Sequence, residues 1–501
     1  MNVLLLYPEF PDTYWSFKHA LPIEGKKSAY PPLGLLTIAA MMPQHWNKRL
    51  VDTNIRPLTD ADLKWADTAM LSGMIVHRQE VLGMLARCRA RGLRTVVGGP
   101  ITNSVSELPQ HADSVVYGEA EDLMEELIAD LERGDPKPSY KATALPSLHK
   151  TPVPDLSLIN TRYYSAMPIQ YSRGCPFNCE FCDIIEIYGR VPRTKTPAQV
   201  LAELDQLRDR KWRGSVFIVD DNFIGNKRKA KELLAVLADW NRRYRRPFSF
   251  FTEASINLAD DAELLQMMKD ANFTRVFMGI ETPVEASLKE AHKMQNTRRN
   301  LVESVHRIQD YGLEVMAGFI VGFDNDPEDI FDRQVQFIRE SAIPLAMVGI
   351  LLALPGTQLF RRLTKEGRIL NEGHGDNMDL RLNFIPKMNA QKLIQGYRDI
   401  LRRIYTPEAY YERALTFLER YKHPNHRPRV HSDYMALVRS FIKLGILSDS
   451  RSSYWKFVAK SALHHRKTFD IAMTLAVMGY HFQTLTRIVL GTEVTLPDVV
   501  Q

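Results

Sequence analysis

The 501-residue sequence has little that would suit a secreted or membrane-spanning protein. It contains only 4 cysteines, too few for the disulfide framework of a small secreted domain. Its longest apolar stretches, residues 345–354 and 471–478, are too short to cross a bilayer. The first residues, MNVLLLYPEF, lack the basic segment of a secretory signal and predict a buried strand. We therefore expect a cytoplasmic protein.

Other absences narrow the function. The 26 Gly and 28 Pro residues are ordinary in number, which excludes a fibrous or low-complexity protein. The sequence has no GxGxxG and no GxxxxGK[ST], so a dinucleotide or ATP site is unsupported. No RNA-binding module and no Ser-His-Asp or Cys-His nucleophile is recognisable, and no nucleic-acid partner is expected. The 45% of hydrophobic residues suffices for sizeable cores, and the length suggests about three units.

Three of the four cysteines fall within eight residues, at Cys175, Cys179 and Cys182. An odd number of thiols in a reducing cytosol argues against disulfide bonds. Structural zinc normally needs four ligands, and no partnering pair follows nearby. Iron–sulfur cubanes are also held by thiolates, and three of these would leave one iron open. The fourth cysteine, Cys88, lies in a helical pattern and is interpreted as a core residue.

The segment RGCPFNCEFC, residues 173–182, resembles the cluster loop of the radical S-adenosylmethionine (SAM) enzymes. The resemblance lies in the CxxxCxxC spacing, in the aromatic residue before the last cysteine and in the preceding strand. It implies a [4Fe–4S] cluster on Cys175, Cys179 and Cys182, with SAM chelated by the open iron. It also implies that Phe181 lies near the adenine of SAM.

After Cys182, apolar strand-like runs alternate with amphipathic helices, which is typical of βα units and a parallel sheet. With the strand before the cluster they number six: 165–174, 215–223, 248–256, 275–282, 313–323 and 346–356. This matches the partial (β/α)6 barrel of the family, which we place at residues 165–385. Barrel enzymes keep their chemistry at the carboxyl ends of the strands. The resemblance implies SAM contacts there from Asp220, Asp221, Asn222, Glu253, Ser255, Glu281, Gly318 and Gly322.

Each acidic residue also has a structural interpretation. A carboxylate at a strand end can cap the following helix, and this alternative stays open for Asp220 and Asp221. Glu253 lies inside an apolar strand, where an unpaired charge is costly, so we expect a ligand or a partner for it.

Residues 1–140 alternate strands with helices, which predicts a separate doubly wound open sheet with ligand loops at its strand ends. The order of its loops resembles the cobalamin-binding domain found ahead of many radical SAM barrels. The resemblance implies cobalamin contacts from Tyr30, Asp52, Asn54, Ser72, Gly73, Gly98, Gly99, Pro100, Gly118 and Glu119. A degenerate domain that binds nothing is the alternative.

One position departs from the methionine-synthase type of cobalamin domain. That type carries a cobalt-ligating His two residues after an Asp, whereas this sequence has Asn54 two residues after Asp52. We therefore expect cobalt without an imidazole from this loop. His77 is a less favoured candidate for the cobalt ligand, and a surface or packed histidine is the simpler interpretation.

Residues 141–164 are proline-spaced and are interpreted as a linker. Residues 386–501 are mostly helical in pattern and resemble the extension of a branch that includes hopanoid C-2 methylases. Residues 401–501 hold 15 Lys or Arg and 8 Asp or Glu, a net charge of +7. Basic amphipathic helices suit a membrane surface or an anionic partner. A solvated cap over the barrel mouth is the alternative.

Taken together, these resemblances imply a cobalamin-dependent radical SAM enzyme. We expect it to methylate an unactivated carbon of a hydrophobic, polycyclic or isoprenoid substrate through a 5′-deoxyadenosyl radical and methylcobalamin. A flavodoxin-like or ferredoxin-like donor would supply electrons, and peripheral contact with the inner membrane surface stays open. A radical SAM cyclase, oxidase or rearrangement enzyme is one alternative. A non-catalytic iron–sulfur and cobalamin sensor is another.

Overall fold

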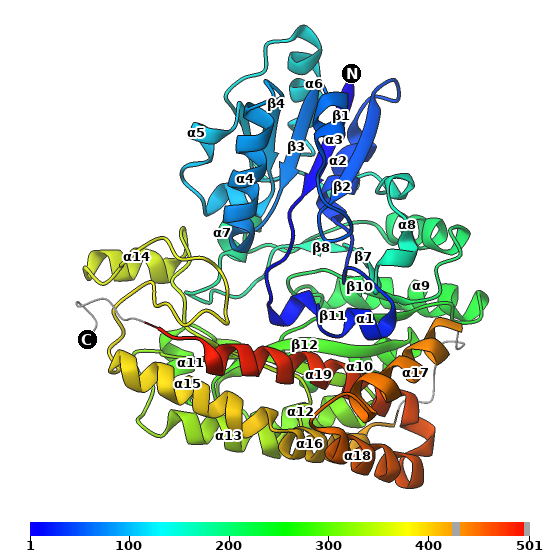
Figure 1. The fold of residues 1–501 in the computed structure, drawn as a ribbon, viewed down its shortest axis with the longest axis vertical. Coiled ribbons are helices and arrows are strands. Elements are labelled where there is room, and N and C mark those ends of the chain that lie inside the picture. Colours follow the sequence, from blue (N-terminus) through cyan, green and yellow to red (C-terminus); the bar gives the residue numbers. More distant parts are fainter. Residues whose placement is uncertain (423–430, 495–501) are drawn as a thin grey trace.

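The computed structural model describes residues 1–422 and 431–494. A sheet domain forms the upper part of the molecule, and a second sheet domain lies below it together with the C-terminal helices (Figure 1). Both large sheets are parallel, which confirms the predicted α/β fold class.

The N-terminal sheet has six parallel strands in the order β2-β1-β3-β4-β5-β6. They are Asn2–Tyr7 (β1), Asn47–Asp52 (β2), Thr68–Ser72 (β3), Arg94–Gly98 (β4), Ser114–Tyr117 (β5) and Ser139–Lys141 (β6). Helices cover both faces: Leu33–Met41 (α2) and Met124–Arg133 (α6) on one, Asp60–Trp65 (α3), Arg78–Arg89 (α4) and Leu108–His111 (α5) on the other. The strand order reverses at β1 and β3, and ligands of such sheets bind at the carboxyl ends there.

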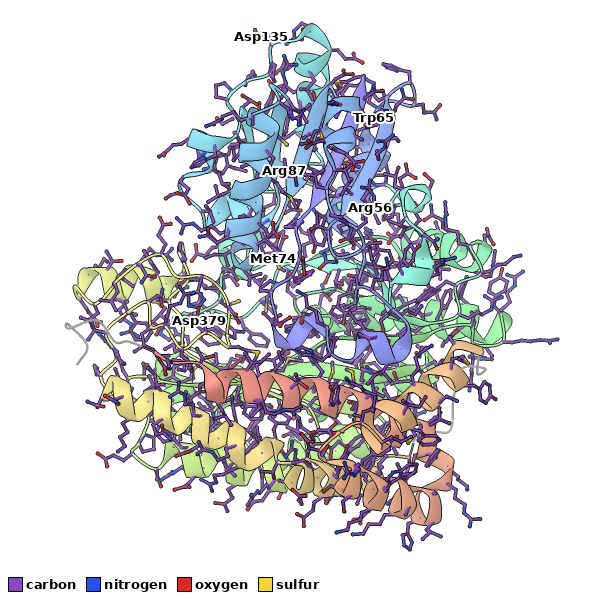
Figure 2. All side chains as sticks on the ribbon, viewed as in Figure 1. Arg56, Trp65, Met74, Arg87, Asp135 and Asp379 are labelled. Carbon is purple, nitrogen blue, oxygen red and sulfur yellow. The ribbon has the colours of Figure 1, made fainter. Side chains whose placement is uncertain are left out.

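A cavity of about 470 Å³ opens in this domain between the loop after β2 and helix α4. Arg56 and Arg87 line it and lie on the lower part of the sheet domain (Figure 2). Arg56 is already paired with Asp62 at 2.7 Å. We therefore assign no ligand to this cavity.

The second sheet also has six parallel strands, in the order β7-β10-β11-β12-β13-β14, and forms the partial barrel. They are Ala166–Ile169 (β7), Ser215–Ile218 (β10), Ser249–Glu253 (β11), Phe273–Glu281 (β12), Glu314–Val321 (β13) and Ala346–Ile350 (β14). The helices between them are Pro197–Asp209 (α8), Lys227–Arg243 (α9), Ala262–Asp270 (α10), Leu301–Asp310 (α12) and Ile330–Glu340 (α13). A two-stranded antiparallel ribbon, Ser172–Arg173 (β8) with Arg193–Thr194 (β9), follows β7.

Aromatic side chains from neighbouring strands pack together in the interior of the barrel. Phe217 and Phe251 stack with ring centroids 4.5 Å apart and planes 3° apart. Trp15 stacks on Phe217 at 6.2 Å and meets the ring of Phe277 edge-on at 5.0 Å. Because Trp15 belongs to the 3-10 helix Tyr14–Ser16 (η1), a segment far upstream of the barrel helps to fill it.

The chain between β1 and α2 leaves the sheet domain and crosses to the barrel. The Tyr14 hydroxyl donates to the carbonyl oxygen of Val348 on β14 at 3.0 Å. Helix Leu21–Glu24 (α1) packs against the C-terminal helix His431–Gly445 (α17). The predicted sheet domain of residues 1–140 therefore has an exception: the segment between β1 and α2 packs into the barrel domain.

In the described part of the C-terminal extension, 386–422 and 431–494, the α-helices are Ala390–Tyr405 (α15), Pro407–Arg420 (α16), His431–Gly445 (α17), Arg451–His464 (α18) and Phe469–Gly491 (α19). Helix α15 packs against β14 and α13, and α19 packs against η1. Tyr405 and Phe482 share one buried core with the barrel strands. The extension is thus a wall of the barrel domain and not the solvated cap considered from the sequence.

A buried arginine joins this wall to the barrel. Arg413 on α16 is 3% exposed. Its guanidinium donates to the carbonyl oxygens of Ile343, Ile404 and Pro344 at 2.7, 2.8 and 3.2 Å. Burial lowers the pKa of Arg413, because a buried positive charge loses its hydration. The three carbonyl oxygens replace hydrogen bonds that water would otherwise accept.

We expect Arg413→Met to destabilise the protein, because three buried carbonyl groups lose their donor. The loss corresponds to about 3 kcal/mol of unfolding free energy and to a thermal midpoint lower by about 5 °C. Arg420→Met on the same helix is the control, since the ion pair that Arg420 forms within the described residues is an exposed 3.7 Å contact with Asp310. Equal thermal midpoints of the two variants would contradict this account.

Candidate active site

The three clustered cysteines lie on the loop that follows β8. This loop begins at Gly174, whose φ is 95°. A Cβ atom at Gly174 would lie 2.9 Å from the carbonyl oxygen of Gly189. The Cys175 amide donates to that same oxygen at 3.3 Å. Only glycine suits both the angle and the close approach, so the loop is folded tightly against its own return segment.

Side-chain amides approach two of the sulfur atoms. The Asn222 Nδ2 atom lies 3.8 Å from Cys175 Sγ, and the Gln295 Nε2 atom lies 3.6 Å from Cys179 Sγ. N–H groups aimed at sulfur stabilise a thiolate and tune the potential of a cluster bound to it. These two donors fit an iron–sulfur cluster on the loop.

Lys293 adds a positive charge beside the loop. Its ammonium group interacts electrostatically with Cys179 and Cys182. Burial raises the pKa of the Cys175 and Cys182 thiols, so metal binding would have to displace their protons. Within residues 1–422 and 431–494, no three His, Cys, Asp or Glu side chains converge closely enough to ligate one metal ion.

Asp220 holds the base of the cysteine loop. One carboxylate oxygen accepts from the Tyr171 amide at 2.8 Å. The other accepts from the amide and the hydroxyl of Ser172, at 2.9 and 2.7 Å. Both oxygens are therefore used by the connection between β7 and β8. Asp220 therefore has a positioning role, which is not the helix cap considered from the sequence, and its expected SAM contact stays a prediction.

Asn222 links the cysteine loop to the end of β11. Besides facing Cys175, its Nδ2 atom donates to Ser255 Oγ at 3.1 Å, and its Oδ1 atom accepts from the Ser255 amide at 3.3 Å. Asp221 accepts from the Gly174 amide at 3.2 Å, and burial raises its pKa to about 7. The structure thus brings Asp221, Asn222 and Ser255 together around the loop.

Glu253 ends β11 two residues after Phe251, so the two side chains project from the same side of the strand. No hydrogen bond reaches its carboxylate from the part of the chain that the structure describes. Burial raises the pKa of Glu253 to about 8, and the neighbouring Asp221 and Asp220 add to the shift. A poorly solvated carboxylate without a donor is costly, and a ligand that brings an N–H group or a positive charge would relieve that cost.

Glu281 forms an ion pair with Lys293 at 2.7 Å. Its φ of 65° is left-handed, a strained conformation for a residue with a side chain. A Cβ atom at Gly279 would lie 2.2 Å from the Glu281 carboxylate and 2.6 Å from the Lys293 ammonium. The pair therefore occupies space that only glycine leaves free. Lys293 also lies 5.9 Å from the ring centroid of Phe181, which places Phe181 beside the pair.

The two glycines expected to contact SAM, Gly318 and Gly322, are closely packed against side chains. A Cβ atom at Gly318 would lie 3.1 Å from the Phe277 ring inside the barrel. Gly322 has a φ of 105°, and a Cβ atom there would lie 3.1 Å from Leu393 on α15. Gly318 thus faces the interior, whereas Gly322 packs against the C-terminal wall.

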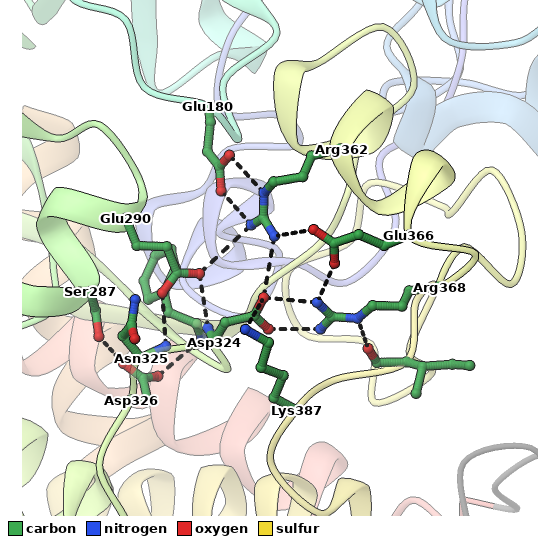
Figure 3. Close-up of polar contacts among 12 residues, drawn as sticks. Glu180, Ser287, Glu290, Asp324, Asn325, Asp326, Arg362, Glu366, Arg368 and Lys387 are labelled. Atoms are coloured by element: carbon green, nitrogen blue, oxygen red, sulfur yellow. Dashed lines mark hydrogen bonds and ion pairs between the residues drawn. The ribbon is translucent and has the colours of Figure 1, made fainter.

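Acidic residues of the barrel loops converge on two arginines of the C-terminal region (Figure 3). Arg362, on helix Gln358–Lys365 (α14), contacts Glu180 of the cysteine loop at 2.7 Å and Asp324 after β13 at 3.2 Å. Arg368 contacts Asp324 at 2.7 Å. The Leu359 amide donates to the Glu180 carbonyl oxygen at 2.8 Å. The start of α14 therefore clamps the loop between Cys179 and Phe181.

In the sheet domain, Asp52 and Asn54 are satisfied within the protein. Asp52 accepts from Asn54 Nδ2 at 2.8 Å and from the Tyr164 hydroxyl at 2.9 Å. The Asn54 amide also donates to the Pro8 carbonyl and accepts from the Phe10 amide, at 3.1 and 3.0 Å. The Asn54 side chain is thus committed to backbone groups and not available as a metal ligand.

Tyr30 lies apart from the other residues expected to contact cobalamin. Its ring is 5.3 Å from that of Phe217 and 6.4 Å from that of Phe251. Tyr30 therefore belongs to the aromatic interior of the barrel, because the segment after β1 carries it there.

Small residues gather at the ends of β3 and β4. Gly99 has a φ of 83°, and a Cβ atom there would lie 2.3 Å from Ser72 Oγ. The Ile101 amide, just after Pro100, donates to the Gly73 carbonyl oxygen at 2.9 Å. Gly98 ends β4, and Gly118, with a φ of 81°, follows β5. These small residues leave little side-chain bulk at the carboxyl ends of β3, β4 and β5, on one side of the switch point of the sheet.

His77 packs beside this edge. Its Nδ1 atom accepts from the Met74 amide at 3.1 Å, whereas its Nε2 atom is buried without a partner among the described residues. Burial lowers the pKa of His77 to about 4, so the ring is neutral with its proton on Nε2. A protonated Nε2 atom is a donor and not a metal ligand.

Glu119 joins the two domains. Its carboxylate contacts Arg173, two residues before Cys175, at 2.5 Å and accepts from Arg193 at 3.0 Å. Glu121 contacts the same Arg173 at 2.8 Å. Both oxygens of Glu119 are held by guanidinium groups, so Glu119 connects the two domains, and its expected cobalamin contact stays a prediction.

Sequence reasoning missed Lys293, Gln295, Arg173 and Arg362, all of which contact the cysteine loop or its neighbours. Arg173 directly precedes the motif and could have been found from its charge beside the acidic YGEAE segment. The other three lie more than 100 residues downstream in segments without a motif. Only the fold brings them to the loop.

Comparison with known proteins defines the class. A family model described as the radical SAM superfamily matches residues 169–338, and one described as a domain of unknown function matches residues 357–493. An uncharacterized methyltransferase of Synechocystis sp. is 41% identical over 496 residues, 98% of this chain and 92% of that protein. The hopanoid C-2 methylase of Rhodopseudomonas palustris is 35% identical over 495 residues, 96% of this chain and 92% of that enzyme.

Solved structures share the fold. The cobalamin-dependent SAM radical enzyme OxsB, with aqua-cobalamin and SAM bound, has a TM-score of 0.62 at 15% identity, covering 100% of this chain and 82% of that one. The radical SAM methyltransferase TsrM from Kitasatospora setae, with cobalamin and a [4Fe–4S] cluster bound, also has a TM-score of 0.62. It is 13% identical and covers 93% of this chain and 99% of that one.

The chain therefore belongs to the radical SAM superfamily, whose enzymes use a [4Fe–4S] cluster and SAM. Within that superfamily it lies in the same branch as the hopanoid C-2 methylase, over nearly its full length. The family predicted from the cysteine motif is confirmed.

We expect Cys182→Ala to lose the cluster, because two thiolates cannot hold a cubane. Iron content of the anaerobically reconstituted protein should fall from about four atoms per chain to near zero, together with the brown colour. Cys88→Ala is the matched control, since Cys88 is buried on α4 away from the loop. Full iron content in the Cys182 variant would refute the assignment.

Proposed function

We propose that this protein is a cobalamin-dependent radical SAM methyltransferase that methylates an unactivated carbon of a hydrophobic, polycyclic or isoprenoid lipid-like substrate. The names of its relatives support methyl transfer, and the cobalamin bound to its structural neighbours supports the second cofactor. The observation that carries the proposal is the joint of Arg173 with Glu119. It fixes the ligand edge of the sheet domain opposite the cysteine loop.

The residues around the loop suit a zwitterionic ligand such as SAM. Glu253 offers a carboxylate without a donor to an amino group, and Lys293 offers an ammonium to a carboxylate. We assign SAM contacts to these two residues and to Phe181, Asp221, Asn222, Ser255 and Glu281. Gly318 stays in the set because it keeps the interior beside Phe277 open.

The small residues at the ends of β3, β4 and β5 suit a bulky planar ligand. These residues lie at the carboxyl ends of three adjacent strands: Ser72, Gly73, Gly98, Gly99, Pro100 and Gly118. We assign the corrin side of the site to these residues, with His77 as a neighbouring donor. When bound, the cluster, SAM and cobalamin would supply the radical that removes a hydrogen atom and the methyl group that replaces it.

The aromatic interior supports an apolar substrate. Phe217, Phe251 and Phe277 lie on three adjacent strands, and Trp15 covers them from the N-terminal segment. Glu253 lies one step nearer the strand ends than Phe251. An apolar substrate seated against these rings would lie next to the expected SAM site, and the walls would exclude water from a radical.

The proposal includes a flavodoxin-like or ferredoxin-like electron donor and peripheral contact with the inner membrane surface. A lipid-like substrate would be reached from that surface. Among residues 1–422 and 431–494, no helix has the length and apolarity needed to cross a membrane.

The decisive experiment is anaerobic turnover of the reconstituted protein with methyl-labelled SAM, dithionite and cobalamin. We expect 5′-deoxyadenosine release and label transfer to an apolar lipid extract that contains polycyclic isoprenoids. Release of deoxyadenosine without label transfer would favour a cyclase or rearrangement enzyme. If a cluster-loaded protein gives neither deoxyadenosine nor labelled lipid, the proposal is refuted and the sensor alternative remains.

We expect Glu253→Gln to raise the KM for SAM and to slow deoxyadenosine release about 10- to 100-fold, because a neutral amide binds an amino group less well than a carboxylate. Glu314→Gln is the matched control. Glu314 is also a buried interior carboxylate, but it lies with Arg275 at the amino ends of the strands. Equal losses in the two variants would place the effect in barrel stability and not in SAM binding.

A further inference from the structure

Helix α17 (His431–Gly445) carries an apolar stripe that faces solvent. Tyr434, Val438 and Ile442 follow one another at four-residue intervals, Ile446 continues the spacing directly after the helix, and the four are 47–62% exposed. Residues at this spacing lie on one face of a helix, and such a stripe normally faces a core. Met435 widens the stripe at 39% exposure. Here nothing in the described chain covers that face.

The stripe continues onto helix α18 (Arg451–His464). Trp455, 44% exposed, stacks on Phe441 at 5.4 Å and donates to the Gly445 carbonyl oxygen at 2.9 Å. Leu463, two turns further along α18, is 65% exposed. We call α17, α18 and the turn between them the α17–α18 hairpin.

This concentration is unusual for the molecule. Of the 13 large apolar side chains that are exposed within the described residues, eight lie on the α17–α18 hairpin. Single exposed apolar residues need no explanation, but a contiguous patch marks an interaction site. The hairpin therefore presents a surface that a partner would cover.

The hairpin is firmly attached to the rest of the protein on its other side. Ser440 and Tyr454 are buried and share a hydrogen bond of 2.8 Å between the two helices. Arg439 donates to the Ile23 carbonyl oxygen at 2.7 Å, which ties α17 to the N-terminal segment. The exposed stripe thus belongs to a packed element with one buried and one open face.

The positive charge of the hairpin favours an anionic partner. Residues 431–467 contain seven Lys or Arg and two Asp, a net charge of +5. Lys456 and Lys460 lie on the exposed face of α18, beside Trp455. Two copies of this surface would bring like charges together. An anionic lipid surface would match both the charge and the apolar stripe, with Trp and Tyr at the boundary.

We propose that the α17–α18 hairpin docks the protein onto an anionic membrane surface, with its apolar stripe in the headgroup region and its lysines against lipid phosphates. The proposal rests on the proposed function only in that a lipid-like substrate gives the docking a purpose. Vesicle binding needs neither SAM nor turnover, so the two proposals can fail separately.

The test is co-sedimentation of the full-length protein with vesicles of phosphatidylcholine alone and with about one third phosphatidylglycerol. We expect the protein to bind the anionic vesicles and to be released in part by high salt, which screens the lysines but not the apolar contacts. No binding to anionic vesicles at low salt would overturn the proposal.

Two sets of variants separate the apolar and the charged contributions. Ile442→Ser with Ile446→Ser should weaken binding about tenfold or more. Lys456→Gln with Lys460→Gln should weaken it about fivefold for each lysine, and only with anionic vesicles. The controls are Ile488→Ser on α19 and Lys64→Gln with Lys141→Gln on the sheet domain, which change the same residue types elsewhere.

Circular dichroism and deoxyadenosine release should be unchanged in all of these variants, because the altered side chains are exposed and lie on elements that carry neither the cysteine loop nor the residues placed around it. Vesicle binding that the hairpin variants leave intact would overturn the proposal. So would a wild-type dimer in sedimentation equilibrium that ignores vesicles and is dissociated by the isoleucine changes, since the stripe would then be a dimer interface.

Discussion

The arrangement of the two ligand-binding edges depends on one buried charge cluster. The side chains of Arg173, Glu119 and Glu121 are 12%, 2% and 3% exposed. Removing one partner from such a cluster leaves a charge without compensation, at a cost of about 3–5 kcal/mol. Arg173 belongs to the strand that starts the cysteine loop, and the two glutamates follow β5 of the sheet domain. The pairing therefore fixes one edge against the other.

The strand and helix pattern could be predicted because both sheets are parallel and buried on both faces, so their strands are continuous apolar runs. Short β6 was missed because three residues give no such run. The cysteine loop was predictable because its ligands are local. Lys293, Gln295 and Arg362 were not, because each reaches the loop through the fold. Tyr30 was misplaced since nothing in its local sequence shows that the chain after β1 crosses to the barrel.

Polar residues at strand ends serve two purposes in this protein. Asp220 and Asn54 were expected to contact ligands, yet their side chains already form hydrogen bonds with backbone groups of the protein. Glu253, from the same kind of position, has a carboxylate that the described residues leave without a donor. Residue type and position therefore indicate the neighbourhood of a site, whereas the count of satisfied hydrogen bonds separates scaffold from candidate contact.

The packing of Tyr14 on Phe482, with ring centroids 5.2 Å apart, has a consequence for synthesis. During translation the barrel strands leave the ribosome long before α19, the last helix, which packs along their side. Until α19 emerges, the aromatic residues of the N-terminal segment lack this packing partner. Contacts of such sequence separation form late and slowly. The barrel therefore cannot be completed until nearly the whole polypeptide has left the ribosome, and folding chaperones would meet it as an open, aromatic-lined half-barrel.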